Sequence, residues 1–138
     1  MRSFLIFAIL VLFVACGVQP PAGDSVIVDD EVPAEGGFRR VTLLDGLEHP
    51  WAMTWLPNGD LLITERPGRL RLVSAGRLQA APVAGVPEVF AIGQGGLLDI
   101  LLSPNFADNR RVFFTYAHGS DDANRTRVAR ATFTGKAL

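Results

Sequence analysis

The stretch WAMTWLPNGDLLITERPGRLRLV, residues 51–73, contains three short apolar segments separated by turn signals. The segments are 51–56, 60–65 and 69–73. Pro57-Asn58-Gly59 and Pro67-Gly68 divide them, and these residues supply the fixed and positive φ angles that tight turns need. The last segment alternates polar and apolar residues, as a half-buried strand does. The stretch therefore predicts an antiparallel meander of short strands.

Two tryptophans, Trp51 and Trp55, alternate with smaller residues along the first of these segments. Because successive side chains of a strand point to opposite faces, both indoles are expected on the same side of it. We expect that side to belong to the hydrophobic core.

The same plan recurs further along the chain. LDILLSPN (98–105) repeats the pattern of AMTWLPN (52–58), and Pro57 and Pro104 are 47 positions apart. A repeat of about 40–50 residues built from several short strands is typical of a β-propeller blade. Periodicity alone leaves an alternative open, which is a chance recurrence of Pro-Asn after an apolar run in an ordinary β-sandwich.

Gln94 stands among three glycines, Gly93, Gly95 and Gly96, directly before the first strand of the second copy. The glycines allow positive φ angles and a close approach of another backbone or a flat ligand. An amide both donates and accepts hydrogen bonds, so Gln94 suits hydroxyls or carbonyls and not proton abstraction. In a propeller this loop opens at one mouth of the central channel, where we expect Gln94. The pattern alone favours a simple turn over a ligand site, and the Lys and Ser/Thr of a phosphate loop are absent.

Three stretches carry a resemblance that covers most of the chain. They are HPWAMTWLPNGDLLITERPGRLRLV (49–73), GVPEVFAIGQGGLLDILLSPNF (85–106) and RRVFFTYA (110–117). Together they resemble the N-terminal part of the glucose/sorbosone dehydrogenase family, whose members are soluble quinoprotein aldose sugar dehydrogenases. The combination of HPWA, ERPG and GQGGLLD in this order is specific, and the resemblance runs from about residue 43 to residue 134.

The resemblance implies an all-β fold in which residues 38–138 form the first one and a half to two blades of a six-bladed β-propeller. It also implies pyrroloquinoline quinone and calcium ions bound over the channel mouth, and oxidation of the anomeric hydroxyl of an aldose sugar to a lactone. The glutamine of the family's GQGG lies in the pocket with sugar and cofactor, and this role maps onto Gln94 with its glycine loop. Hydride passes to the quinone while a histidine base takes the hydroxyl proton.

The sequence departs from the family further downstream. The catalytic histidine lies in a segment of the GNHxGG type, and neither it nor the later cofactor and calcium ligands are present, so we assign no catalytic and no metal-binding residue. His49 is expected to cap or pack a turn, and His118 to lie solvated in a polar loop. Asp121 and Asp122 lack the ligand order and closing Glu of a calcium loop and are expected in a solvated turn.

Residues 1–15 have the charged, apolar, small-residue order of a secretory signal. The apolar run from Phe4 to Val14 spans 11 residues, whereas a membrane-spanning helix needs roughly 20.

Cys16, the only cysteine, ends a stretch that resembles a lipoprotein lipobox, with Phe13 where that motif prefers Leu. A lipid on Cys16 would hold an exported protein on a periplasmic or outer-surface membrane face. An ordinary signal peptide with an incidental cysteine is the alternative.

Residues 16–37 are rich in Pro, Gly and acidic residues and predict a flexible tether between the lipid anchor and the domain. The chain carries 13 basic and 14 acidic residues without a charge block, so no basic field for nucleic acid is present.

Two functions remain open. The first is the head of a quinoprotein sugar dehydrogenase, cut short inside the second blade at Leu138 and inactive by itself. The second is a non-catalytic surface lipoprotein whose degenerate propeller binds glycan or protein.

Overall fold

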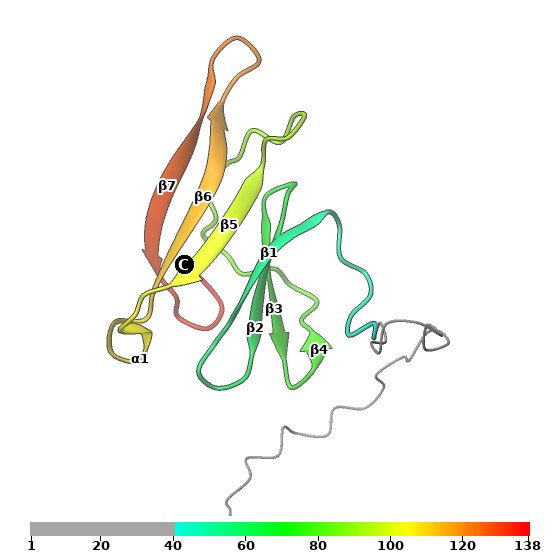
Figure 1. The fold of residues 1–138 in the computed structure, drawn as a ribbon, viewed down its shortest axis with the longest axis vertical. Helices are drawn as coiled ribbons and strands as arrows, with labels where there is room; N and C mark the ends of the chain where they lie inside the picture. Colours follow the sequence, from blue (N-terminus) through cyan, green and yellow to red (C-terminus); the bar gives the residue numbers. More distant parts are fainter. Residues whose placement is uncertain (1–40) are drawn as a thin grey trace, which may run out of the picture.

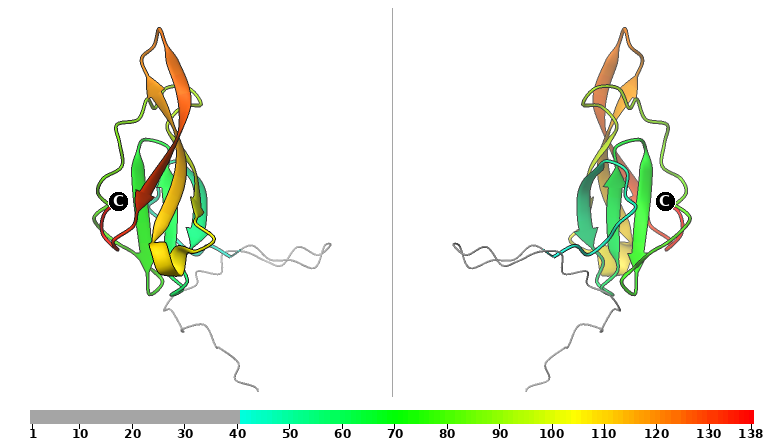
Figure 2. Two further views of the ribbon diagram at one scale, coloured as in Figure 1. Left: turned by 90° about the vertical axis from the view of Figure 1, so that its left-hand side faces the viewer. Right: turned by 90° about the vertical axis from the view of Figure 1, so that its right-hand side faces the viewer.

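The computed structural model describes residues 41–138, which form two antiparallel β-sheets (Figure 1). The predicted signal peptide (1–15), tether (16–37) and lipidation residue Cys16 lie outside the described residues. Seen from the side, the two sheets form two layers, and the last hairpin projects beyond the first sheet (Figure 2). Within residues 41–138, no helix is long and apolar enough to cross a membrane.

The first sheet is the meander that the sequence predicts. Its strands lie side by side in chain order: β1 (Pro50–Trp55), β2 (Leu61–Glu65), β3 (Arg69–Ser74) and β4 (Arg77–Leu78). Both expected turns are present, because the N–H of Gly59 donates to the carbonyl of Leu56 and the N–H of Gly68 donates to that of Glu65, each at 2.9 Å. Gly59 and Gly68 have φ angles of 84° and 112°, which favour glycine.

The second sheet repeats this plan with one insertion. It contains β5 (Leu97–Leu102), β6 (Arg111–Gly119) and β7 (Asn124–Thr132), again in chain order. Where the first sheet has a tight turn after its Pro-Asn, the second has the short helix α1 (Phe106–Asn109). The first strands of the two sheets, β1 and β5, lie next to each other (Figure 1).

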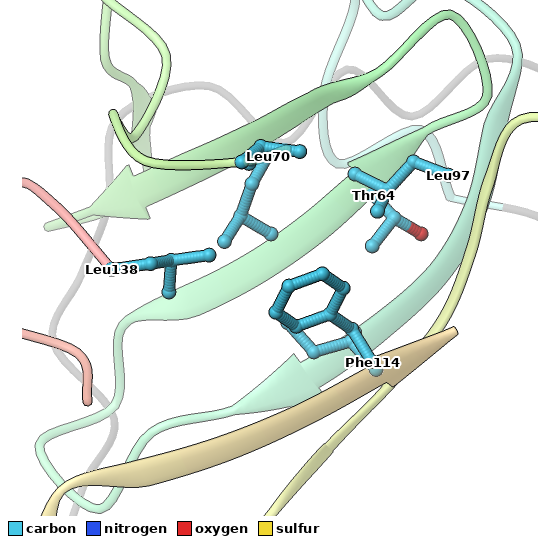
Figure 3. A pocket seen from close by; sticks show the side chains of 7 residues that line it. Thr64, Leu70, Leu97, Phe114 and Leu138 are labelled. Atoms are coloured by element: carbon cyan, nitrogen blue, oxygen red, sulfur yellow. The ribbon is translucent and has the colours of Figure 1, made fainter. Parts of the chain in front are cut away.

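The hydrophobic core lies between the two sheets. Leu70 of the first sheet packs with Leu97 and Phe114 of the second, and Leu138 closes one side (Figure 3). The buried members of this cluster are Leu56, Leu62, Leu70, Val83, Leu97, Ile100, Phe106, Val112, Phe114, Tyr116 and Phe133. The packing of two meanders on each other therefore provides most of the apolar burial.

Both β1 and β5 carry a β-bulge near the start, and each bulge is completed by a threonine of the following strand. The N–H of Ala52 donates to the hydroxyl of Thr64, and the N–H of Asp99 donates to the hydroxyl of Thr115, each at 3.0 Å. Ala52 and Asp99 are 47 positions apart, as the sequence repeat requires. The threonines are 51 apart because the four-residue α1 is inserted between them.

The connection between the sheets is joined to the end of the chain. The N–H of Ala84 donates to the carbonyl of Lys136 at 3.0 Å, and the N–H of Leu138 donates to the carbonyl of Ala84 at 2.8 Å. On its other side, Val83 donates to the carbonyl of Leu70 in β3 at 2.8 Å. Residues 83 and 84 therefore lie between β3 and residues 136–138.

The expectation that Trp51 and Trp55 lie in the core is wrong. They do share one side of β1, with Met53, but their exposed fractions are 49% and 58%. The register pairs Trp55 with Leu61 of β2, which places these side chains on the outer face of the first sheet. Among the described residues, only part of that face is covered, where Leu44 and its neighbours pack on β2 and β3. The outer face of the second sheet likewise exposes Leu101 and Val128.

Candidate functional site

The loop around Gln94 is a β-turn that leads into β5. The N–H of Gly95 donates to the carbonyl of Ile92 at 2.9 Å, and Gly93 has a φ angle of 59°. Positive φ at the second position of such a turn is the place for glycine. Gln94 occupies the third position and is exposed.

The other two glycines allow close packing. A Cβ on Gly96, whose φ is 142°, would lie 2.1 Å from the carbonyl oxygen of Arg66. A Cβ on Gly95 would lie 2.6 Å from the carbonyl oxygen of Phe90. The expected positive φ is therefore found at Gly93 and Gly96 but not at Gly95, where the requirement for glycine comes from the close approach of backbone.

Arg66 connects this loop to the first sheet through three different groups. Its N–H donates to the carbonyl of His49 at 3.0 Å, and its carbonyl accepts from the N–H of Leu97 at 2.9 Å. Its guanidinium donates to the carbonyl of Gly93. The start of β1, the β2–β3 turn and the loop before β5 are thus joined at a single residue.

These three segments surround an open hollow of about 370 Å³ near the starts of β1 and β5. The residues that line it are His49, Pro50, Trp51, Arg66 and Gln94. The lining combines an amide, a guanidinium, an imidazole and the flat face of an indole. This volume lies within the usual range of ligand sites. The structure therefore brings Gln94 together with polar and aromatic side chains that can contact a flat or hydroxyl-bearing ligand.

The two histidines differ from their expected settings. His49 is exposed on the rim of the hollow and has a positive φ of 47°, so it does not pack the turn. Positive φ is strained for a residue with a Cβ. His118 belongs to β6 and not to a loop, is half-buried, and its ring lies edge-on to that of Tyr116 at 6.2 Å. Asp121 and Asp122 are exposed between β6 and β7, as expected.

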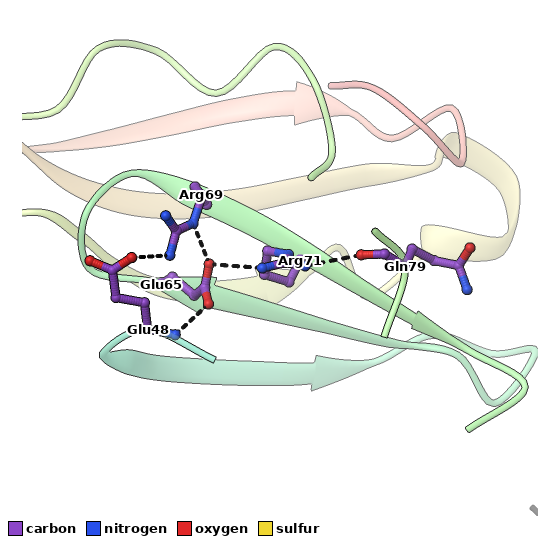
Figure 4. A network of polar contacts seen from close by, with 5 residues as sticks. All are labelled: Glu48, Glu65, Arg69, Arg71 and Gln79. Atoms are coloured by element: carbon purple, nitrogen blue, oxygen red, sulfur yellow. Dashed lines mark hydrogen bonds and ion pairs between the residues drawn. The ribbon is translucent and has the colours of Figure 1, made fainter. Parts of the chain in front are cut away.

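A buried carboxylate that was not predicted from the sequence, Glu65, lies next to two residues that line the hollow. Glu65 is fully buried, accepts the N–H of Glu48 at 2.6 Å and the Nε–H of Arg69 at 2.6 Å, and pairs with Arg71 at 3.4 Å (Figure 4). Burial by itself raises the pKa of Glu65, but the hydrogen bonds from Arg69 and Glu48 outweigh it and hold the pKa below the ordinary value of 4.5. The hydrogen bond to Glu65, and a second one to the carboxylate of Glu48 at 2.6 Å, raise the pKa of Arg69. Opposite charges at the paired positions 65 and 69 of the hairpin were the available signal.

The family model for glucose/sorbosone dehydrogenase matches residues 47–138, which include every residue that lines the hollow. The chain belongs to the glucose/sorbosone dehydrogenase family. An uncharacterized protein of Synechocystis sp. is 59% identical over 109 residues, covering 73% of this chain and 26% of that protein. The aldose sugar dehydrogenase YliI of Escherichia coli is 52% identical over 81 residues, covering 58% of this chain and 22% of that enzyme.

Solved structures of the family have the same fold over the described region. A glucose dehydrogenase matches with a TM-score of 0.65 at 47% identity, covering 70% of this chain and 31% of that one. The PQQ-bound form of aldose sugar dehydrogenase from Streptomyces coelicolor matches with a TM-score of 0.60 at 34% identity, covering 69% and 28%. The prediction of an all-β chain forming the first blades of a six-bladed β-propeller is confirmed. This glucose/sorbosone dehydrogenase chain spans about a quarter of the length of the curated relatives it matches.

Proposed function

We propose that this chain supplies one wall of the sugar- and quinone-binding pocket of an aldose sugar dehydrogenase that uses pyrroloquinoline quinone and oxidises the anomeric hydroxyl to a lactone. The observation that carries the proposal is the position of Gln94 in the hollow with His49, Trp51 and Arg66. Family membership and the PQQ-bound form of a structural neighbour support it.

The lining residues fit one side of such a pocket. The half-exposed indole of Trp51 offers a flat apolar surface, and the amide of Gln94 can donate to one ligand oxygen and accept from a hydroxyl. Gln94 has no basic group at neutral pH, so it orients the sugar and does not take its proton. When bound, pyrroloquinoline quinone would supply the two-electron acceptor chemistry that side chains lack.

Calcium is not assigned to any residue of this chain. Within residues 41–138, no three side chains of His, Cys, Asp or Glu lie close enough together to hold a metal ion. The proposal therefore gives these residues a role in binding and orientation only.

For the location of the protein, we propose that a lipid on Cys16 anchors it to a membrane after export. The support is the short apolar run before this only cysteine. The stretch that follows, rich in Pro and Gly, would keep the propeller blades at some distance from the lipid surface.

A chimera tests the role of Gln94 in catalysis. Residues 47–138 replace the matching part of YliI, and aldose oxidation is measured with pyrroloquinoline quinone and calcium added. We expect the chimera to be active and Gln94→Ala to lower kcat/KM about tenfold, the effect of losing one or two hydrogen bonds. Gln79→Ala is the matched control, because within residues 41–138 the Gln79 side-chain amide hydrogen-bonds only to the carbonyl of Arg77 and does not line the hollow. Equal activities of the two variants would contradict the proposal.

By themselves, these 138 residues are proposed to be inactive and of low stability, because both outer sheet faces expose apolar side chains. The purified chain is assayed under the same conditions, and aldose oxidation by it would refute this part. Binding of glycan by the chain, together with an inactive chimera, would instead favour a non-catalytic surface lipoprotein.

A further inference from the structure

We infer that Arg66 is a positioning residue that holds the Gln94 side chain in the pocket by fixing the turn on which Gln94 stands. The inference rests on the proposed function for the role of Gln94, and it adds a residue that does not itself need to touch the sugar. In this arrangement, the Arg66 side chain at the end of β2 sets the geometry of the loop that leads into β5.

The contacts of Arg66 reach both ends of the turn. The guanidinium donates to the carbonyl of Gly93, immediately before Gln94. The Arg66 carbonyl accepts from the N–H of Leu97, immediately after the glycines. Because both ends are attached to one residue, the backbone of Gln94 has little freedom to move relative to the first sheet.

The fit at Gly96 makes this attachment tight. The backbone of Arg66 lies so close to Gly96 that a Cβ there would lie 2.1 Å from the Arg66 carbonyl oxygen and 2.6 Å from its Cγ. The stem of the arginine side chain therefore packs directly on the glycine backbone. A side chain at position 96 would therefore force the Arg66 backbone or its Cγ to move.

Arg66 also differs from the other arginines of its hairpin. Arg69 and Arg71 both pair with the buried Glu65. Among the described residues, the guanidinium of Arg66 forms its hydrogen bond with a neutral carbonyl and no ion pair with a carboxylate. A charged donor makes this bond stronger than one between neutral groups.

The first test needs no ligand. Hydrogen exchange of the Gly95 and Leu97 amides is measured in the full chain, since these N–H groups bond to Ile92 and Arg66. We expect Arg66→Leu to speed exchange at Gly95 at least tenfold without a similar change in β2 and β3. Arg66→Lys keeps one charged donor and should restore part of the protection. Arg77→Leu, at an exposed arginine of β4, is the control and should change neither amide.

The second test reads the pocket itself. The chain has two tryptophans, and only Trp51 lines the hollow. In a Trp55→Phe variant, the fluorescence of Trp51 is measured while pyrroloquinoline quinone is added. The Trp51→Phe variant, which retains Trp55, corrects for the light that the quinone absorbs. We expect Arg66→Leu and Gln94→Ala each to weaken binding about tenfold, and the double variant to be no weaker than either.

The outcomes separate the two proposals. If Gln94→Ala and Gln79→Ala chimeras are equally active while Arg66→Leu still speeds exchange at Gly95, the proposed function fails and the positioning role stands. If exchange at Gly95 is the same in the parent and in Arg66→Leu, or if the two substitutions weaken binding additively, the positioning role is overturned. Should Arg66→Leu not fold, the same measurements on Arg66→Met decide, because Met keeps an unbranched stem against Gly96 and removes the charged donor to the Gly93 carbonyl.

Discussion

The hydroxyl of Thr64 connects the two sheets: it accepts the N–H of Ala52 at 3.0 Å and donates to the carbonyl of Leu98 at 2.6 Å. Thr64 is fully buried and its partners Ala52 and Leu98 are half-buried, so removing the hydroxyl takes a protein partner away from two partly buried backbone groups. A single side chain thus completes the bulge of the first blade and joins it to the inner strand of the second.

We predict that Thr64→Val destabilises the chain by about 1–3 kcal/mol, because the partly buried N–H of Ala52 and carbonyl of Leu98 both lose their hydrogen-bond partner. The side chain keeps its volume, so no cavity contributes. Urea unfolding followed by circular dichroism measures the change. Thr126→Val, on the exposed part of β7, is the control and should stay within about 0.5 kcal/mol of the parent. If both variants lost the same free energy of unfolding, the hydrogen bonds of Thr64 would not be the cause of the destabilisation.

The glycines of the loop should differ sharply in their tolerance of alanine. At Gly93, a Cβ meets no atom within 4 Å, so Gly93→Ala should cost only the left-handed backbone penalty of about 1–2 kcal/mol. At Gly96, the Cβ would overlap the Arg66 carbonyl, and we expect a loss above about 4 kcal/mol. Thermal unfolding of the two variants compares them, and equal losses would show that the close contact at Gly96 relaxes freely.

The buried Glu65 should make stability depend on pH. Its pKa is lower in the folded chain than the ordinary 4.5, so the folded state favours the ionised form. The resulting stabilisation is complete well above pH 4.5 and is lost as the pH falls through the lowered folded pKa. We therefore predict that the stability difference between the parent and Glu65→Gln is largest near neutral pH and narrows in acid.

Denaturant midpoints of both proteins, measured from about pH 7 to about pH 3, test this linkage. Glu88→Gln is a suitable control, because it removes a carboxylate that forms no hydrogen bond with the buried cluster. A difference between the parent and Glu65→Gln that stays constant over the whole pH range would show that Glu65 does not titrate with folding.

The anchoring proposal predicts the behaviour of a single variant. Cys16→Ser should move the protein from the membrane fraction to the soluble fraction, because several acyl chains each contribute roughly 0.8 kcal/mol per buried methylene. Cell fractionation and metabolic labelling with a fatty acid measure this. Ser3→Ala, which leaves the cysteine intact, is the control. A Cys16→Ser protein that remains with membranes would contradict lipidation as the anchor.

The sequence predicts those features that depend on local pattern. The Pro-Asn repeat at Pro57 and Pro104 indicates two copies of one strand plan, and Gly59 and Gly68 mark the turns of the first copy. Both predictions are confirmed because turn geometry depends on backbone φ angles that few residues other than glycine adopt. The position of Gln94 before the second inner strand follows from the same repeat.

Features that depend on contacts between the two copies could not be predicted in the same way. The bulge threonines Thr64 and Thr115 were missed, since α1 shifts the second away from the 47-residue repeat. Arg66 carried no signal, because its partner Gly93 is 27 residues away. Trp51 and Trp55 were placed in the core because alternation along a strand says which residues share a side but not whether anything covers it.

The bonds between Ala84 and residues 136–138 join positions about 53 residues apart. A ribosome adding about 5–20 residues per second needs roughly 3–10 s to make that stretch. The hairpins β1–β2 and β2–β3 pair within a few residues of each turn and can form as they emerge, whereas Ala84 must wait for its partners. Until then, the edge beside Ala84 is open to strands of neighbouring nascent chains. The edge beside Ala84 is therefore covered only once residues 136–138 have been synthesised and have folded back onto it.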